Sequence, residues 1–208
     1  AASVDLPSAA DTLTTVMNQF KPAAETAEES VLRAAKSVDV LAAGSKFGAV
    51  EAADLATSLK ESGGVANGLG VSLEQAVGAL EAMGDKSLKA EKAGVGFRNF
   101  LTIVASKGIG MKDGVLDIGK ALEELAPIQN DVTQLVKIFG RENLLTAQTL
   151  ISGRENYKNY TEAVSEVGVA AEQARINLDN LAGDQARLAA SLEGLQLSIF
   201  GNLKGEAR

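Results

Sequence analysis

Carboxylates are the side chains of this sequence best suited to acid–base chemistry, because it contains no Cys and no His. The absence of Cys and His removes thiolate nucleophiles, imidazole bases and the usual zinc ligands. Adjacent acidic pairs occur at Glu28-Glu29 and Glu123-Glu124. A catalytic pair needs one carboxyl whose pKa is raised in a cleft. With 27 Asp and Glu residues in the chain, adjacent pairs must occur, so a solvated helix face is the preferred interpretation.

Two glycine motifs could in principle bind a phosphate group. They are Gly94-Val95-Gly96 and Gly108-Ile109-Gly110. A dinucleotide site requires a preceding strand and a third spaced glycine, and neither motif has them. We therefore interpret the first motif as a helix-packing feature and the second as a flexible turn.

Two Glu-Ser steps, Glu29-Ser30 and Glu61-Ser62, resemble the Glu-Ser step of lytic transglycosylases. A peptidoglycan hydrolase fragment that uses a single Glu is therefore one alternative function. The residues around both steps do not support it, and both are assigned to helix surface. We predict no catalytic, cofactor-binding or metal-binding residue, no cofactor, and no enzymatic activity.

Charge and hydropathy exclude other classes of function. The net charge is −7, and Lys and Arg are scattered singly, so specific nucleic-acid binding is not expected. No run of about 18 apolar residues is present, so we expect no membrane span in this sequence. Because the chain opens with Ala1-Ala2-Ser3 and lacks an initiator Met, we expect it to be a piece of a longer protein.

Apolar residues recur at helical spacing along most of the chain. Pro7 and Ser8 mark the start of the first periodic stretch, and Pro22 interrupts the pattern after it. A third stretch runs from about Val50 to Leu59 and is expected to close at Ser62-Gly63-Gly64; residues 63–70 could form a short helix or a loop. The first two stretches consist of Leu13, Val16, Met17 and Phe20, and of Ala27, Val31, Ala34, Val38 and Leu41.

The best-defined helix start lies at Ser72-Leu73-Glu74-Gln75, which has the form of a capping box. The helix is expected to begin at Leu73 and to end at Gly84, which is free to adopt the left-handed conformation. A partner helix begins near Leu88. It contains Gly94 and Gly96, each of which costs about 1 kcal/mol relative to Ala, and this suggests close packing against a neighbour.

After Lys107, the segment KGIGMKDG is interpreted as a linker. Three short helices are expected over residues 115–126, 131–139 and 141–152. A weakly amphipathic stretch follows over 154–167.

The last part of the chain has a heptad pattern, which is typical of a helix that pairs with another helix. Gln185 alone interrupts it at a d position. We expect self-association through this helix. The apolar positions run through Ala174, Leu178, Leu181, Leu188, Leu192, Leu195 and Ile199.

The predicted fold is all-α: a helical bundle of short amphipathic helices followed by a longer heptad-patterned C-terminal helix. Residues 1–168 are predicted to form the helical module. Residues 169–208 are predicted to form a coiled-coil arm.

The order of several segments is similar to that of a known protein family. SAADTLTTVMNQF is followed by an Ala-rich segment, by AADLATSLKESG and by a Gly-Val-Ser-Leu-Glu helix start. The succession resembles the tail tape measure proteins of long-tailed bacteriophages and prophages. It departs from them at Asp85-Lys86-Ser87, at Ala93-Gly94-Val95 and at Phe97-Arg98-Asn99. The last shared motif is carried by Ala66, Leu69, Gly70, Val71, Ser72, Leu73 and Glu74.

The resemblance implies a virion structural protein that lies in the lumen of the tail tube or at the tail tip. Such a protein sets tail length, takes part in tail assembly in the host cytoplasm, and leaves the tube during genome ejection. Its implied partners are tail tube, tail-tip or tail chaperone proteins. An alternative is a helical effector or translocator of a bacterial contractile or secretion apparatus.

Overall fold

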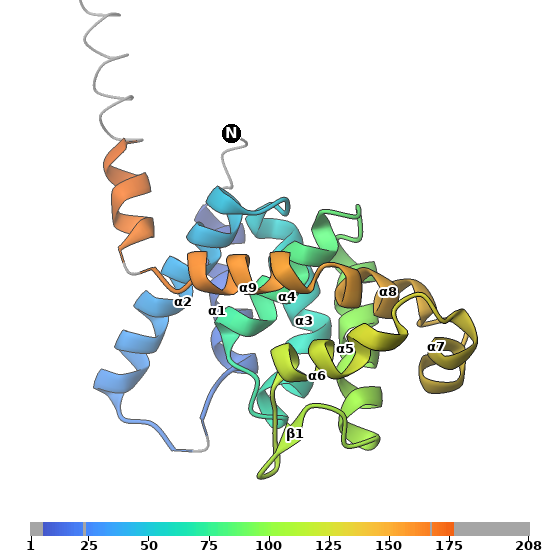
Figure 1. Ribbon diagram of the computed structural model, residues 1–208. Coiled ribbons are helices and arrows are strands. Elements are labelled where there is room, and N and C mark those ends of the chain that lie inside the picture. Colours follow the sequence, from blue (N-terminus) through green and yellow to red (C-terminus); the bar gives the residue numbers. More distant parts are fainter. Residues whose placement is uncertain (1–5, 23, 167, 177–208) are drawn as a thin grey trace, which may run out of the picture. The chain divides into compact units, whose positions relative to one another are not determined.

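The computed structural model describes residues 6–22, 24–166 and 168–176. The chain divides into two units between Val169 and Ala170. In the first unit, the described residues form helices joined by short connections and one small hairpin (Figure 1). The predicted all-α class is confirmed. The elements are α1 (Leu6–Gln19), α2 (Ala27–Phe47), α3 (Ala52–Gly68), α4 (Leu73–Gly84), α5 (Ala90–Ser106), β1 (Met111–Lys112), β2 (Val115–Leu116), α6 (Ile118–Leu125), η1 (Ala126–Ile128), α7 (Val132–Phe139), α8 (Leu144–Ser152) and α9 (Arg154–Ala163).

Helix α4 is the central element of the first unit. Every residue from Leu73 to Gly84 except Gln75 is buried. Helices α2, α3, α5, α8 and α9 all contact it, and α9 crosses it in Figure 1. The predicted capping box is present: the Gln75 N–H donates to Ser72 Oγ over 3.2 Å, and the Ser72 N–H donates to Gln75 Oε1 over 3.0 Å. The start of the central helix is therefore fixed by local sequence.

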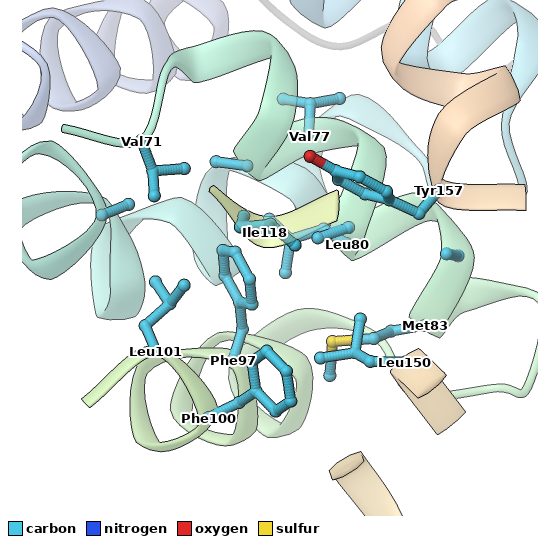
Figure 2. Packing of buried hydrophobic residues seen from close by; sticks show 14 of the residues in the cluster. Val71, Val77, Leu80, Met83, Phe97, Phe100, Leu101, Ile118, Leu150 and Tyr157 are labelled. Carbon is cyan, nitrogen blue, oxygen red and sulfur yellow. The ribbon is translucent and has the colours of Figure 1, made fainter. Parts of the chain in front are cut away.

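The part of the hydrophobic core drawn in Figure 2 lies between α4 and α5 and is closed by α6, α8 and α9. The core continues to Leu55 and Leu59 of α3. Phe97, Phe100 and Leu101 of α5 face it together with Val77, Leu80 and Met83 of α4. The ring of Phe100 also stacks on that of Phe139 from α7, with 5.5 Å between ring centroids. These aromatic and aliphatic contacts anchor the short α7 to the bundle.

The close helix packing predicted from Gly94 and Gly96 is confirmed. A Cβ atom on Gly94 would lie 2.5 Å from the Ser58 carbonyl oxygen of α3, and one on Gly96 would lie 2.5 Å from Thr146 Oγ1 of α8. The Ser58 hydroxyl donates to the Ala90 carbonyl oxygen at the start of α5 over 2.7 Å. Backbone contact between α3 and α5 therefore requires glycine at position 94.

Helix α3 does not close at Ser62-Gly63-Gly64, as the glycines suggested, but continues to Gly68. The same glycines let α1 approach. A Cβ atom on Gly63 would lie 2.9 Å from Cβ of Gln19 and 3.1 Å from Cε2 of Phe20. Packing against α1 outweighs the low helix propensity of the pair. The segment 63–70, undecided from the sequence, is thus mostly helix.

Helix α4 ends at Gly84, as predicted, but Gly84 does not adopt the left-handed conformation. Ser87, three residues later, takes the left-handed conformation with φ of 63°. Gly84 is needed for another reason, since a Cβ atom there would overlap the Val50 side chain. It makes room for the connection between α2 and α3.

The segment KGIGMKDG is not merely a linker, because it contains β1 and the turn of an antiparallel hairpin. Met111 pairs with Leu116 and Lys112 with Val115. Asp113 and Gly114 both have positive φ, as a two-residue type I′ turn requires. The Leu116 N–H donates to the Leu69 carbonyl oxygen over 2.9 Å, which ties the hairpin to the end of α3. The helix expected from residue 115 therefore starts at Ile118.

An arginine fork joins α1 to α2. Arg33 Nε and Nη2 donate to the two carboxylate oxygens of Glu25 over 2.6 and 2.8 Å, and Arg33 Nη1 donates to the Met17 carbonyl oxygen over 2.6 Å. This geometry fixes the connection between the two helices.

Candidate functional site

The two Glu residues considered for cell-wall hydrolysis have structural roles. Glu29 completes a capping box at the start of α2, where its Oε2 accepts from the Thr26 N–H over 2.8 Å and from the Thr26 hydroxyl over 2.9 Å. These two bonds hold the pKa of Glu29 below its ordinary value, which is the opposite of what a general acid needs. Glu61 lies 3.4 Å from Arg98 Nη1 in an ion pair between α3 and α5.

The acidic pair Glu123-Glu124 is divided between separate partners. Glu123 Oε1 lies 2.9 Å from Lys158 Nζ, and the pKa of Glu123 is lowered by Lys158 and then by Arg154. Glu124 Oε2 accepts from the Gly110 N–H over 3.0 Å. The pair therefore ties α6 to α9 and to the hairpin. The other pair, Glu28-Glu29, lies exposed in the first turn of α2.

Neither glycine motif has the setting of a phosphate site. Gly94 and Gly96 lie inside α5 and face neighbouring helices. The Gly110 N–H already donates to a carboxylate, that of Glu124. An anion would have to displace a negative group there, so the second motif is unsuited to phosphate.

Sequence reasoning missed Glu81, the most unusual carboxyl of the described residues. Its side chain is on α4 and is completely buried. Its Oε2 accepts from the Val50 N–H over 2.9 Å, whereas its Oε1 is buried without a hydrogen-bond partner among the described residues. Buried polar atoms are nearly always paired, so such an atom marks a special position. The helical spacing of Val77 and Leu80 placed Glu81 on a helix but gave no sign of its burial.

Burial raises the pKa of Glu81 to about 7, against the lowering effect of the Val50 and Ala49 N–H groups. The negative charge of Asp85 raises it further and the positive charge of Lys89 lowers it. Asp85 in turn accepts from the Tyr160 hydroxyl over 2.9 Å. Burial, followed by this bond, raises the pKa of Tyr160 to about 12.

A second buried carboxyl on α4, Glu74, has a cation partner. It forms an ion pair with Lys36 of α2. Burial by itself raises the pKa of Glu74, but Lys36 and nearby hydrogen bonds bring it below its ordinary value. Glu74 is therefore a conventional buried anion.

The exposed apolar surface of α2 is the candidate interaction surface of the first unit. Val31 is 69% exposed, Leu32 64% and Val38 39%. The prediction that Ala27, Val31, Ala34, Val38 and Leu41 form the apolar face of this helix is thus largely wrong, because only Leu41 is buried. The core instead receives Ser37, Val40, Leu41, Ala43 and Gly44. A pocket of about 280 Å³ beside this surface is lined by Leu32, Ala35, Lys36, Asp39, Val40, Glu74, Val164, Ser165 and Glu166.

Within the described ranges, no group of three or more His, Cys, Asp or Glu side chains could hold a metal ion. In the same ranges, no helix has the length and apolar content to cross a membrane. The heptad positions Leu178 to Ile199 lie outside the described residues.

Helices packed around a central helix, with polar groups used for caps and ion pairs, are features of a structural module. Residues 1–141 match the model of the family described as phage-related minor tail protein, and the chain belongs to this family. It is thus a structural protein of a phage tail, as the sequence resemblance indicated. It is similar to the tape measure protein of Pneumococcus phage Dp-1, with 24% identity over 183 residues. The aligned region covers 77% of this chain and 16% of that relative. No solved structure matches the chain.

Proposed function

We propose that this chain is a segment of a tape measure protein, which sets tail length and takes part in tail assembly and genome ejection. The observation that carries the proposal is its similarity to the tape measure protein of phage Dp-1 over 77% of its length. The chain spans 16% of that relative, so the activity of a whole tape measure protein is inferred for it. Residues 1–168 act as the helical module and residues 169–208 as the coiled-coil arm.

The chain acts in the lumen of the tail tube or at the tail tip after assembly in the host cytoplasm. Its partners are tail tube, tail-tip or tail chaperone proteins, and copies of itself through the heptad positions. The net charge of −7 favours this placement, because an acidic protein does not bind tightly to DNA that passes through the same tube. The heptad leucines that support self-association are Leu178, Leu181, Leu188, Leu192 and Leu195, with Ile199.

The chain acts without catalysis. Glu29 and Glu61, the residues considered for hydrolysis, are engaged in a helix cap and an ion pair. Purified protein should therefore release no soluble fragments from isolated cell walls. Release that disappears in either Glu29→Gln or Glu61→Gln would contradict this part of the proposal.

The decisive experiment duplicates residues 171–198 in frame in the phage that encodes this chain, and measures tail length by electron microscopy. The insert adds four whole heptads and keeps the a/d register. As a helix it is about 42 Å long, so tails should lengthen by about that amount. A matched control inserts a polar helical sequence of equal length, which separates added length from added pairing. Tails of unchanged length with both inserts would refute a role of the arm in measuring length.

A further inference from the structure

The carboxyl of Glu81 joins two parts of the first unit that are far apart in sequence. Glu81 lies on the central helix α4, and its hydrogen-bond partner, the Val50 N–H, lies in the connection between α2 and α3. Val50 is itself buried against Gly84, at the end of α4. The Glu81 side chain therefore helps to hold the connection against α4.

Two glycines provide the space in which the carboxyl sits. A Cβ atom on Gly48 would overlap the carboxyl group, and one on Gly44 would lie 3.2 Å from Glu81 Oε1. The end of α2 thus passes directly over the acid. Any movement of the carboxyl toward water requires that the end of α2 and the connection move as well.

The charged and titratable groups around Glu81 do not neutralise it directly. Asp85, one turn later on α4, has the same sign of charge, and Tyr160 of α9 donates its hydroxyl hydrogen to Asp85. Lys89, before α5, donates to the Ala49 carbonyl oxygen. Lys46, near the end of α2, lies over the ring of Phe47, 4.6 Å from its centroid. An ionised Glu81 therefore has a buried charge with an unpartnered oxygen.

We propose that Glu81 is a protonation-controlled latch between α4 and the connection of α2 to α3. The latch is closed while the carboxyl is neutral and is loosened when the carboxyl ionises. Loosening lets the end of α2 and residues 48–51 move away from α4, so that water can reach the charged carboxylate. The device concerns the folding of this module and is independent of the proposed role in tail length.

The direction of the effect follows from proton linkage. The pKa of Glu81 is about 7 in the closed state, and in an open, hydrated state it returns to its ordinary value of 4.5. Between these values the closed state binds more protons than the open state, so each pH unit raises the opening equilibrium about tenfold. Above about pH 7 both states are ionised, and the effect levels off.

Hydrogen exchange with mass spectrometry on the purified chain tests the latch. Peptides that cover residues 44–52 are followed at pH 5 to 8, with rates corrected for the intrinsic pH dependence of exchange. The wild-type opening equilibrium should rise about fortyfold between pH 5 and pH 7, rise by a further factor of about two to pH 8, and then level off. The Glu81→Gln variant, which cannot ionise there, should show no rise. Glu74→Gln, the matched control on the same helix, should keep the wild-type rise.

An equal rise in wild-type and Glu81→Gln protein, or no rise in either, would overturn the proposal. If Glu81→Gln does not fold, the wild-type chain provides the test by NMR. The Cδ signal of Glu81 and the amide signal of Val50 should titrate together, with a midpoint well above 4.5. A Glu81 midpoint near 4.5, or a Val50 amide that does not follow it, would equally overturn the latch.

Discussion

Glu74 and Glu81 lie seven residues apart on α4, and both bury a carboxyl group in contact with α2 or its end, but with opposite electrostatic outcomes. Glu74 has the Lys36 ammonium as a partner, and its pKa is lowered. Glu81 has one backbone N–H bonded to Oε2 and nothing bonded to Oε1 among the described residues, and its pKa is raised to about 7. One helix therefore carries two acids whose contributions to stability change with pH in opposite directions.

Replacement of Glu81 by Gln should stabilise the first unit at pH 8 and leave its stability nearly unchanged at pH 5. In wild-type protein the folded state holds a proton up to about pH 7 that the unfolded state loses near 4.5. Stability is therefore lost as pH rises across that window, by about 3 kcal/mol at most. Urea unfolding at both pH values measures the difference. A variant less stable than wild type at pH 8 would show that the charged form of Glu81 is favoured in the fold.

Replacement of Glu74 by Gln should destabilise the fold at pH 7 by about 1 kcal/mol, because the pair with Lys36 is lost and Lys36 is largely exposed. The pKa of Glu74 is lowered in the folded state, so its contribution is present above 4.5 and is lost as pH falls below it. The difference between variant and wild type in urea unfolding should thus shrink in acid. Lys36→Met should cost at least as much at pH 7, because it leaves the buried Glu74 carboxylate without its cation, and a double variant should be no less stable than Lys36→Met.

Gly94→Ala should destabilise the protein by about 2 to 3 kcal/mol, since the added methyl group would meet the Ser58 backbone of α3. Gly68→Ala is the matched control, because nothing lies within 4 Å of a Cβ atom at the last residue of α3. It should be neutral or stabilising by up to about 1 kcal/mol. Thermal unfolding of the two variants checks this contrast. Equal effects would mean that α3 and α5 can separate at little cost.

Leu59→Ala should destabilise the protein by about 2 to 5 kcal/mol, because Leu59 is completely buried in α3. The same substitution at Leu32, which is 64% exposed on α2, should change stability by less than about 0.5 kcal/mol. Urea unfolding of both variants checks the pair. A large loss for Leu32→Ala in the isolated chain would mean that the α2 surface is covered in solution.

Local sequence signals predicted the parts of the fold that local chemistry determines. The Ser72 to Gln75 capping box gave the start of α4, and Gly94 gave the close approach of another helix. Local signals could not predict the packing between segments that are distant in sequence. Gly63 and Gly84 look like helix terminators in sequence, but in the structure they make room for Phe20 and Val50.

Two further features carried signals of different strength. The Asp113-Gly114 pair is a known turn signal, and with short flanking segments it could have predicted the hairpin. The burial of Glu81 had no comparable signal, because a Glu on an Ala-rich helix reads as a solvent-facing residue. The sequence also did not show which face of α2 is buried, because Val31 and Val38 are as apolar as Val40 and Leu41. Only the arrangement of α4 against α2 decides between them.

The central place of α4 has a mechanical consequence. This helix lies midway along residues 6–169, and the elements around it come from both earlier and later parts of the sequence. Tension applied to the ends of this unit would reach α1 and α9 first and α4 only after its neighbours had been pulled away. The unit would thus unravel from the outside inward and keep its innermost helix until last.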